Sequence, residues 1–168
     1  MDIMSATFVL YKRFGTNLTK STSFVSETSI GSYDTSAPYT SMPVGIPDVA
    51  TTYSYEIVIE PKCTNPPLTM VNNLRMWYQY SDPYAGVKLY GGGTAKGAIF
   101  TPTNNKSTNA TYDMSQYGTI GDSISIPGQA SAVNSVLGRM VLQNGVNNSA
   151  VYSGGIINMI VHFAYDEA

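Results

Sequence analysis

Hydrophobic and polar positions alternate along much of this chain, most regularly in residues 154–166 near its end. Side chains of a β-strand point to opposite faces with a period of two. A strand here would have one wholly apolar face and a second face that is mostly apolar. The first face holds Ile157, Met159, Val161, Phe163 and Tyr165, and the second holds Ile156, Asn158, Ile160, His162 and Ala164. The wholly apolar face must be covered by other side chains, and the second face must also make contacts. We therefore expect this strand inside a sheet and not at an edge.

The same period predicts further strands. The clearest are residues 52–60, which Pro61 is expected to end, and residues 73–80. We expect the glycines 91–93 to end another strand, and the Asn-Gly pair at 144–145 to form a turn. The shorter candidate strands are residues 5–12, 22–30, 87–90, 97–101, 123–126 and 137–143.

Residues 130–142 fit either a helical or a strand pattern. Gly138 lies inside the helical pattern and would cost a helix about 1 kcal/mol. We therefore favour a strand over 137–143, with one helical turn at 130–135. The whole chain then predicts about eight or nine short strands, which indicates an all-β fold. We expect a single antiparallel β-sandwich, Ig-like or jelly-roll in topology, with little helix.

Residues 1–168 are expected to form one domain, because the length suits one core and no repeat is visible. Within it, residues 31–50 are rich in Ser, Thr, Tyr, Pro and Gly, and three prolines there disfavour helix and central strand. This segment is interpreted as an ordered loop or arm on the surface of the domain or of a partner. A plain loop is an equally good interpretation.

Charged residues make up only 12% of the chain, so its polar surface must come from other side chains. The sequence contains 18 Ser, 17 Thr and 12 Asn, together with 13 Tyr. Neutral groups cost less to desolvate than charges, so this surface suits lasting contacts. The net charge of −2 provides no attraction for nucleic acid, and we expect no nucleic-acid partner.

The surface is typical of extracellular and virion proteins, but other features do not fit secretion. Cys63 is the only cysteine, so no internal disulfide can form. The first residues lack the pattern of a secretory signal, and no apolar stretch is long enough for a spanning helix, so we expect no membrane insertion. A virion protein reconciles these observations. An extracellular or cell-surface location is the alternative.

One resemblance lies near the end of the chain, where residues 139–143 are followed by residues 151–160. Tyr152, Gly154 and Ile156 match a Tyr-x-Gly-x-Ile-x-Ile run, and Asn158 departs from it. These segments resemble the closing strand pair of immunoglobulin-like sandwiches. The resemblance implies an Ig-like or jelly-roll sandwich, in a class common among structural proteins of phage and archaeal virions and among cell-surface modules.

No residue pattern indicates catalysis. His162 is the only histidine, and a position on a central strand would not suit the base of a Ser-His-Asp or Cys-His arrangement. One histidine and one cysteine without ligand spacing do not indicate a metal site. We expect no catalytic residues, no metal, no cofactor and no enzyme activity.

Aromatic residues gather around residues 77–90 and indicate a contact surface. Trp77 would share one strand face with Arg75 and Gln79, while Leu74 and Met76 occupy the other face. Such a face suits a protein partner or a sugar ring. Core packing is the plainer interpretation of the tyrosines. The candidate contact residues are Trp77, Arg75, Gln79, Tyr84 and Tyr90.

Four Asn-x-Ser/Thr sequons are candidate glycosylation sites, although a chain this rich in Asn, Ser and Thr should contain several by chance. All four are expected in turns. The acceptors are Asn17, Asn105, Asn109 and Asn147.

Taken together, the sequence favours a non-enzymatic structural protein of a virion, such as a minor capsid, cement, turret or tail component. It would act through contacts with copies of itself and with other virion proteins. The alternative is a carbohydrate-binding or adhesion module that uses the aromatic surface around Trp77. An enzyme is the third and least favoured hypothesis.

Overall fold

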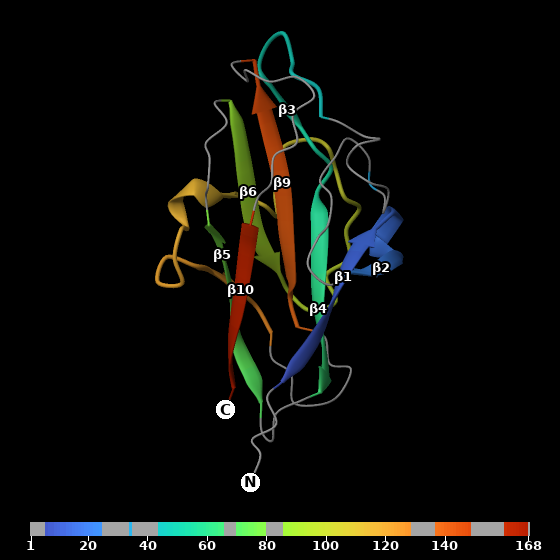
Figure 1. The fold of residues 1–168 in the computed structure, drawn as a ribbon. Coiled ribbons are helices and arrows are strands. Elements are labelled where there is room, and N and C mark those ends of the chain that lie inside the picture. The colour runs from blue at the N-terminus through green and yellow to red at the C-terminus, as the bar shows by residue number, and fades with distance from the viewer. Residues whose placement is uncertain are drawn as a thin grey trace.

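The computed structural model describes residues 6–24, 34, 44–65, 70–79, 86–128, 137–148 and 160–167. Over these residues the chain forms two antiparallel sheets that pack into a sandwich (Figure 1). Two short 3-10 helices, η1 (Thr16–Leu18) and η3 (Met114–Gln116), are the helical elements described. The predicted all-β fold with little helix is confirmed.

The larger sheet has the order β2-β1-β4-β9-β6-β7, and β3 also pairs with β9. The smaller sheet has the order β10-β5-β8. The larger sheet consists of β1 (Thr7–Phe14), β2 (Lys20–Phe24), β3 (Thr51–Tyr53), β4 (Ile57–Asn65), β6 (Val87–Thr94), β7 (Tyr112–Asp113) and β9 (Arg139–Asn147). The smaller sheet consists of β5 (Val71–Gln79), β8 (Ile124–Ile126) and β10 (Ile160–Glu167).

The main core lies between the two sheets, and the period-two pattern explains its composition. Ile57 and Ile59 of β4 face Leu74 and Met76 of β5 across this core. Ile57 and Ile59 are two positions apart on β4, and Leu74 and Met76 are two positions apart on β5. The two residues of each pair therefore point to the same face of their sheet. The strands predicted at 73–80, 123–126 and 137–143 are confirmed in the described residues, as are the faces of residues 74–79.

The outer face of the larger sheet is also covered. Val58 of β4 and Val141 of β9 form a second apolar cluster with Leu18 of η1 and Ala110 of the connection between β6 and β7. Phe100 of the same connection packs against this cluster. The central strands of the larger sheet are therefore buried on both faces.

The glycines at 91–93 do not end a strand, because β6 continues through them to Thr94. A Cβ on Gly92 would collide with the backbone oxygen of Asn109, in the connection that covers the sheet. A Cβ on Gly93 would lie 2.9 Å from Ile126 Cδ1 in β8. These glycines thus allow close approach of other segments to both faces, and the expectation that they end a strand was wrong.

The strand predicted at 52–60 is divided into β3 and β4, which pair with different parts of β9. Between them, Glu56 N donates to Thr103 O (3.0 Å) in the covering connection. Pro61 does not end β4, which runs on to Asn65. The β4–β9 ladder ends at Ile59, and a proline beyond that point removes none of its hydrogen bonds.

Two other local predictions were wrong. Residues 97–101 form no strand, because Ala98 and its neighbours belong to the connection over the outer face. Residues 144–145 lie inside β9 and pair with β6, so they make no turn. The proposed helical turn at 130–135 lies outside the described residues.

The segment 31–50 is described only at Asp34 and at 44–50, where it has no strand or helix. Asp34 Oδ2 accepts a hydrogen bond from Gly15 N (2.5 Å), which fixes this residue against the turn after β1. Burial raises the pKa of the Asp34 carboxyl.

The last strand alternates as predicted but does not lie inside a sheet. Val161, Phe163 and Tyr165 pack against the main core. In the part of the chain that the structure describes, β10 pairs with β5 alone and forms the edge of the smaller sheet. An apolar pattern indicates that a face of the strand is covered. It does not indicate whether the strand has hydrogen-bonded neighbours on both sides. Residues 156–159 of the expected strand lie outside the described residues.

The two segments that resemble a closing strand pair are described only in part. Residues 139–143 belong to β9 in the larger sheet, and residue 160 begins β10 in the smaller sheet. β9 and β10 therefore do not pair with each other in the described residues. Tyr152, Gly154 and Ile156, which carried the resemblance, lie outside them.

Candidate functional site

The outer face of the smaller sheet brings together Trp77 of β5 and His162 of β10. The two residues are direct partners in the antiparallel register. Their ring centroids lie 5.2 Å apart, and the ring planes differ by only 11°. Directly opposed side chains on one face of a sheet are close enough to interact in this way. The stack therefore follows from the pairing of β5 with β10.

Polar contacts fix the imidazole beside the indole. Nε2 of His162 lies 3.0 Å from Oε1 of Gln79, the next outward residue of β5. With the amide oxygen as acceptor, the imidazole donates through Nε2. The three side chains form one connected group on this face.

A second polar group lies farther along the same two strands. Asp166 accepts from Arg75 Nη2 at Oδ1 (2.6 Å) and from Asn73 Nδ2 at Oδ2 (2.6 Å). The Asp166 side chain is 52% exposed, so the ion pair contributes at most about 1 kcal/mol. Its effect is to hold Arg75 and Asn73 in defined positions beside the aromatic stack.

This face is accessible. Ile160, which shares it, is 53% exposed. Gln79 and Ser125 are also exposed, whereas Trp77 and His162 are half-buried. The accessible surface of the smaller sheet thus combines exposed Gln79, Ser125 and Ile160 with two half-buried rings.

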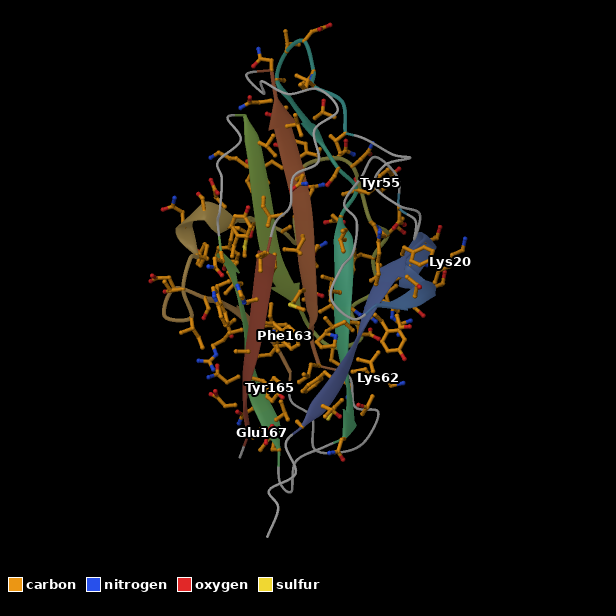
Figure 2. The ribbon with its side chains drawn as sticks, in the orientation of Figure 1. Lys20, Tyr55, Lys62, Phe163, Tyr165 and Glu167 are labelled. Carbon is orange, nitrogen blue, oxygen red and sulfur yellow. The ribbon has the colours of Figure 1, made fainter. Side chains whose placement is uncertain are left out.

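The opposite side of β10 faces inward and ties it to the start of β1. Phe8 lies with its ring centroid 4.8 Å from that of Tyr165 and 6.4 Å from that of Phe163. Tyr165 Oη donates to Ala6 O (2.9 Å), and Ala6 N donates to Glu167 Oε1 (2.7 Å). Figure 2 shows Phe163, Tyr165 and Glu167 along β10, next to the start of β1. These contacts hold the edge strand in place from within.

Three of the predicted contact residues, Trp77, Arg75 and Gln79, do share this face. Tyr90 does not, because it lies on β6 of the larger sheet, packed against the cluster of Val58 and Val141. Its ring centroid lies 6.3 Å from that of Tyr53. Tyr84 lies outside the described residues.

Sequence reasoning missed His162 and Asp166 as members of this face. His162 and Gln79 are 83 positions apart, and Asp166 and Asn73 are 93 apart. Only the pairing of β5 with β10 brings them together. The one available signal was the shared alternation of the two segments, which does not specify which strands pair.

A different polar arrangement is buried under the connection that covers the larger sheet. Gln143 Nε2 donates to the backbone oxygens of Ser54 (2.9 Å) and Asn105 (2.8 Å), and its Oε1 accepts from Ser107 N (2.8 Å). Ser107 Oγ also donates to the buried carboxylate of Glu56. These bonds satisfy polar groups that would otherwise be unpaired, so their role is structural.

Glu60 is at the centre of a charged group in this buried region. Its carboxylate accepts from Arg13 Nε (3.0 Å) and Arg139 Nε (2.6 Å), and its side chain is 1% exposed. Burial acts to raise its pKa, but the hydrogen bonds and charges of the two arginines outweigh burial and hold the pKa of Glu60 below its ordinary value. The three residues join β1, β4 and β9.

The four sequon asparagines differ in environment. Asn17 and Asn105 are exposed, and a glycan could be attached there. Asn109 is half-buried, with Nδ2 3.4 Å from Glu56 Oε1. Asn147 is the last residue of β9 and pairs with Thr51, so its expected position in a turn was wrong.

Within the described ranges, no group of three His, Cys, Asp or Glu side chains could hold a metal ion. No helix in the same ranges is long and apolar enough to cross a membrane. Comparisons with family models, curated proteins and solved structures found no match for this chain.

Proposed function

We propose that this protein is a structural subunit of a virion or of a similar extracellular array, and that it acts through contacts with neighbouring subunits. The observation that carries the proposal is the outer face of the smaller sheet. There a Trp77–His162 stack is held among fixed polar side chains and remains accessible.

Such a face has the properties of a protein contact. Aromatic side chains and arginine are enriched at interfaces, because they offer large contact areas with directional polar groups. Trp77, His162 and Arg75 are already held by partners within the subunit. Binding would therefore cost little additional side-chain entropy.

The composition supports an assembly role in the same way. With 12% charged residues and many hydroxyl and amide side chains, the surface can be buried against a neighbour at a low desolvation cost. The virion is the setting that best combines this surface with a single cysteine.

Light scattering and electron microscopy of the purified protein test the proposal. We expect concentration-dependent oligomers or particles, and we expect Trp77→Ala to weaken them while the circular dichroism spectrum stays that of a β protein. Tyr112→Ala is the matched control, because Tyr112 is an exposed aromatic (46%) on β7 of the other sheet. A monomer at every concentration that joins no particle would contradict the proposal.

Carbohydrate binding is the second candidate, favoured by the grouping of Trp77 with Arg75 and Gln79. Sugar rings stack on flat aromatic faces and hydrogen-bond to planar polar groups. His162 already covers one face of the indole, so a sugar would need the other face or the edge. A saturable change in tryptophan fluorescence on adding a glycan, lost in Trp77→Ala, would support this candidate over assembly.

A further inference from the structure

The described sheets end in strands of very different length. The larger sheet ends at β2, with five residues, and at β7, with two. The smaller sheet ends at β8, with three residues, and at β10, with eight. Natural proteins commonly keep edge strands short, because an open edge invites pairing with another chain. Among the described edges, β10 alone departs from this practice.

The composition of β10 gives its edge little protection. Residues 160–165 include no lysine, arginine, aspartate, glutamate, proline or glycine. The register with β5 shifts only between Ala164 and Asp166, so the preceding residues form a regular ladder. Charged, proline-bearing or bulged edges resist strand addition, and residues 160–164 have none of these features.

We propose that a second copy of this chain adds to this edge, so that two β10 strands pair antiparallel about His162 and the two smaller sheets become one. This inference rests on the proposed assembly function and specifies its contact. In this register Ile160 of one copy lies opposite Ala164 of the other. Main-chain hydrogen bonds would provide the affinity, as in other cases of strand addition.

The distribution of charge favours the antiparallel direction for this pair. Asp166 and Glu167 are at one end of β10. A parallel pair of copies would align these acids with one another, and like charges directly opposed are destabilising. An antiparallel pair places them at opposite ends and leaves uncharged residues 160–164 to face each other. A two-fold axis also closes the contact, so the assembly unit is a dimer.

The pairing would also complete the candidate face. Two Trp77–His162 stacks would meet across the axis, because each His162 would lie opposite its copy. Ile160, which is 53% exposed in the single chain, would gain a neighbour. The edge and the aromatic face would thus belong to one contact.

A pair of matched lysine variants tests the edge. Ile160→Lys places a charge on β10, and Ile99→Lys makes the same change at a 73% exposed position in the connection between β6 and β7. We expect Ile160→Lys to raise the dimer dissociation constant by about tenfold or more, because a lysine on an edge strand opposes pairing. Ile99→Lys should leave the mass measured by light scattering unchanged.

Cysteine variants test the register. The native Cys63 is buried (0% exposed), so a new surface cysteine would react alone. We expect His162→Cys to form a covalent dimer under mild oxidation, because residues on the axis lie within disulfide range. Ile160→Cys should not, because it faces Ala164 of the partner. Cross-linking through Ile160→Cys but not His162→Cys would overturn the proposed register.

The outcomes separate this inference from the proposed function. If the wild type assembles and Ile160→Lys assembles equally well, the edge contact is wrong and the assembly role stands. If the wild type is monomeric and joins no particle, both are wrong.

Discussion

The outer faces of the two sheets differ sharply, although both are built from alternating strands. On the larger sheet the outward residues Val58, Val141 and Gln143 are buried beneath the connection between β6 and β7. On the smaller sheet the outward residues Gln79 and Ile160 are exposed. One face is covered by a segment of the same chain, and the other face remains accessible.

The difference determines what polar side chains do at each face. Under the cover, Gln143 and Glu60 satisfy buried groups and stabilise the fold. On the open face, Gln79 and Asp166 orient aromatic and cationic side chains that a partner can reach. Similar residue types therefore satisfy buried groups on one face and orient accessible side chains on the other. Paired substitutions on the two faces can separate these roles.

The largest difference is expected for the two carboxylates that bind arginine. Glu60→Gln should lower the free energy of unfolding by about 3 kcal/mol, because it leaves Arg139 buried without an anionic partner. Asp166→Asn, on the open face, should cost about 1 kcal/mol or less. Urea denaturation at pH 7 measures both. Equal losses in the two variants would contradict the distinction between the faces.

The Glu60 effect should also depend on pH. Because the folded-state pKa lies below the ordinary value, the contribution of Glu60 is full above the unfolded pKa of about 4.3 and is lost as the pH falls through the folded value. The difference between wild type and Glu60→Gln should therefore narrow in acid.

Gly92→Ala tests how closely the cover is packed. The new methyl group would meet the backbone oxygen of Asn109, which cannot move aside as a side chain can. We expect a loss of about 2 kcal/mol in the free energy of unfolding, as for other overpacked sites. Gly45→Ala is the control, because nothing lies within 4 Å of its new Cβ. A Gly92→Ala variant as stable as this control would show that the connection does not pack as described.

The smallest of these differences is expected for two glutamines. Gln143→Ala should cost about 1.5 kcal/mol, because it leaves buried groups such as Ser107 N unpaired. Gln79→Ala should change stability by no more than about 0.5 kcal/mol, because its side chain is exposed. Thermal unfolding of the two variants measures this difference, and a reversed order would contradict the assignment of the covered face.

The alternating pattern predicted the class of fold and the faces of several strands, since these depend on local periodicity. The pattern placed Trp77 on the same strand face as Arg75 and Gln79, and it placed Leu74 and Met76 on the opposite face. The structure has the same arrangement. It failed at glycines 91–93, where close approach of distant segments explains the residue type.

The remaining errors concern strand pairing, which a local pattern does not specify. The edge position of β10 and the place of Tyr90 on the other sheet both depend on which strands are neighbours. His162 and Asp166 joined the site for the same reason, through pairing with residues more than 80 positions away. Short-range alternation could not identify these partners.

Hydrogen–deuterium exchange, followed from dilute to concentrated protein, tests the assembly contact most directly. Pairing of two copies should protect amides within residues 160–164 as the concentration rises, while amides of Arg139–Asn147 in the covered sheet keep the same exchange rates. Unchanged exchange along β10 over the whole concentration range would contradict the account.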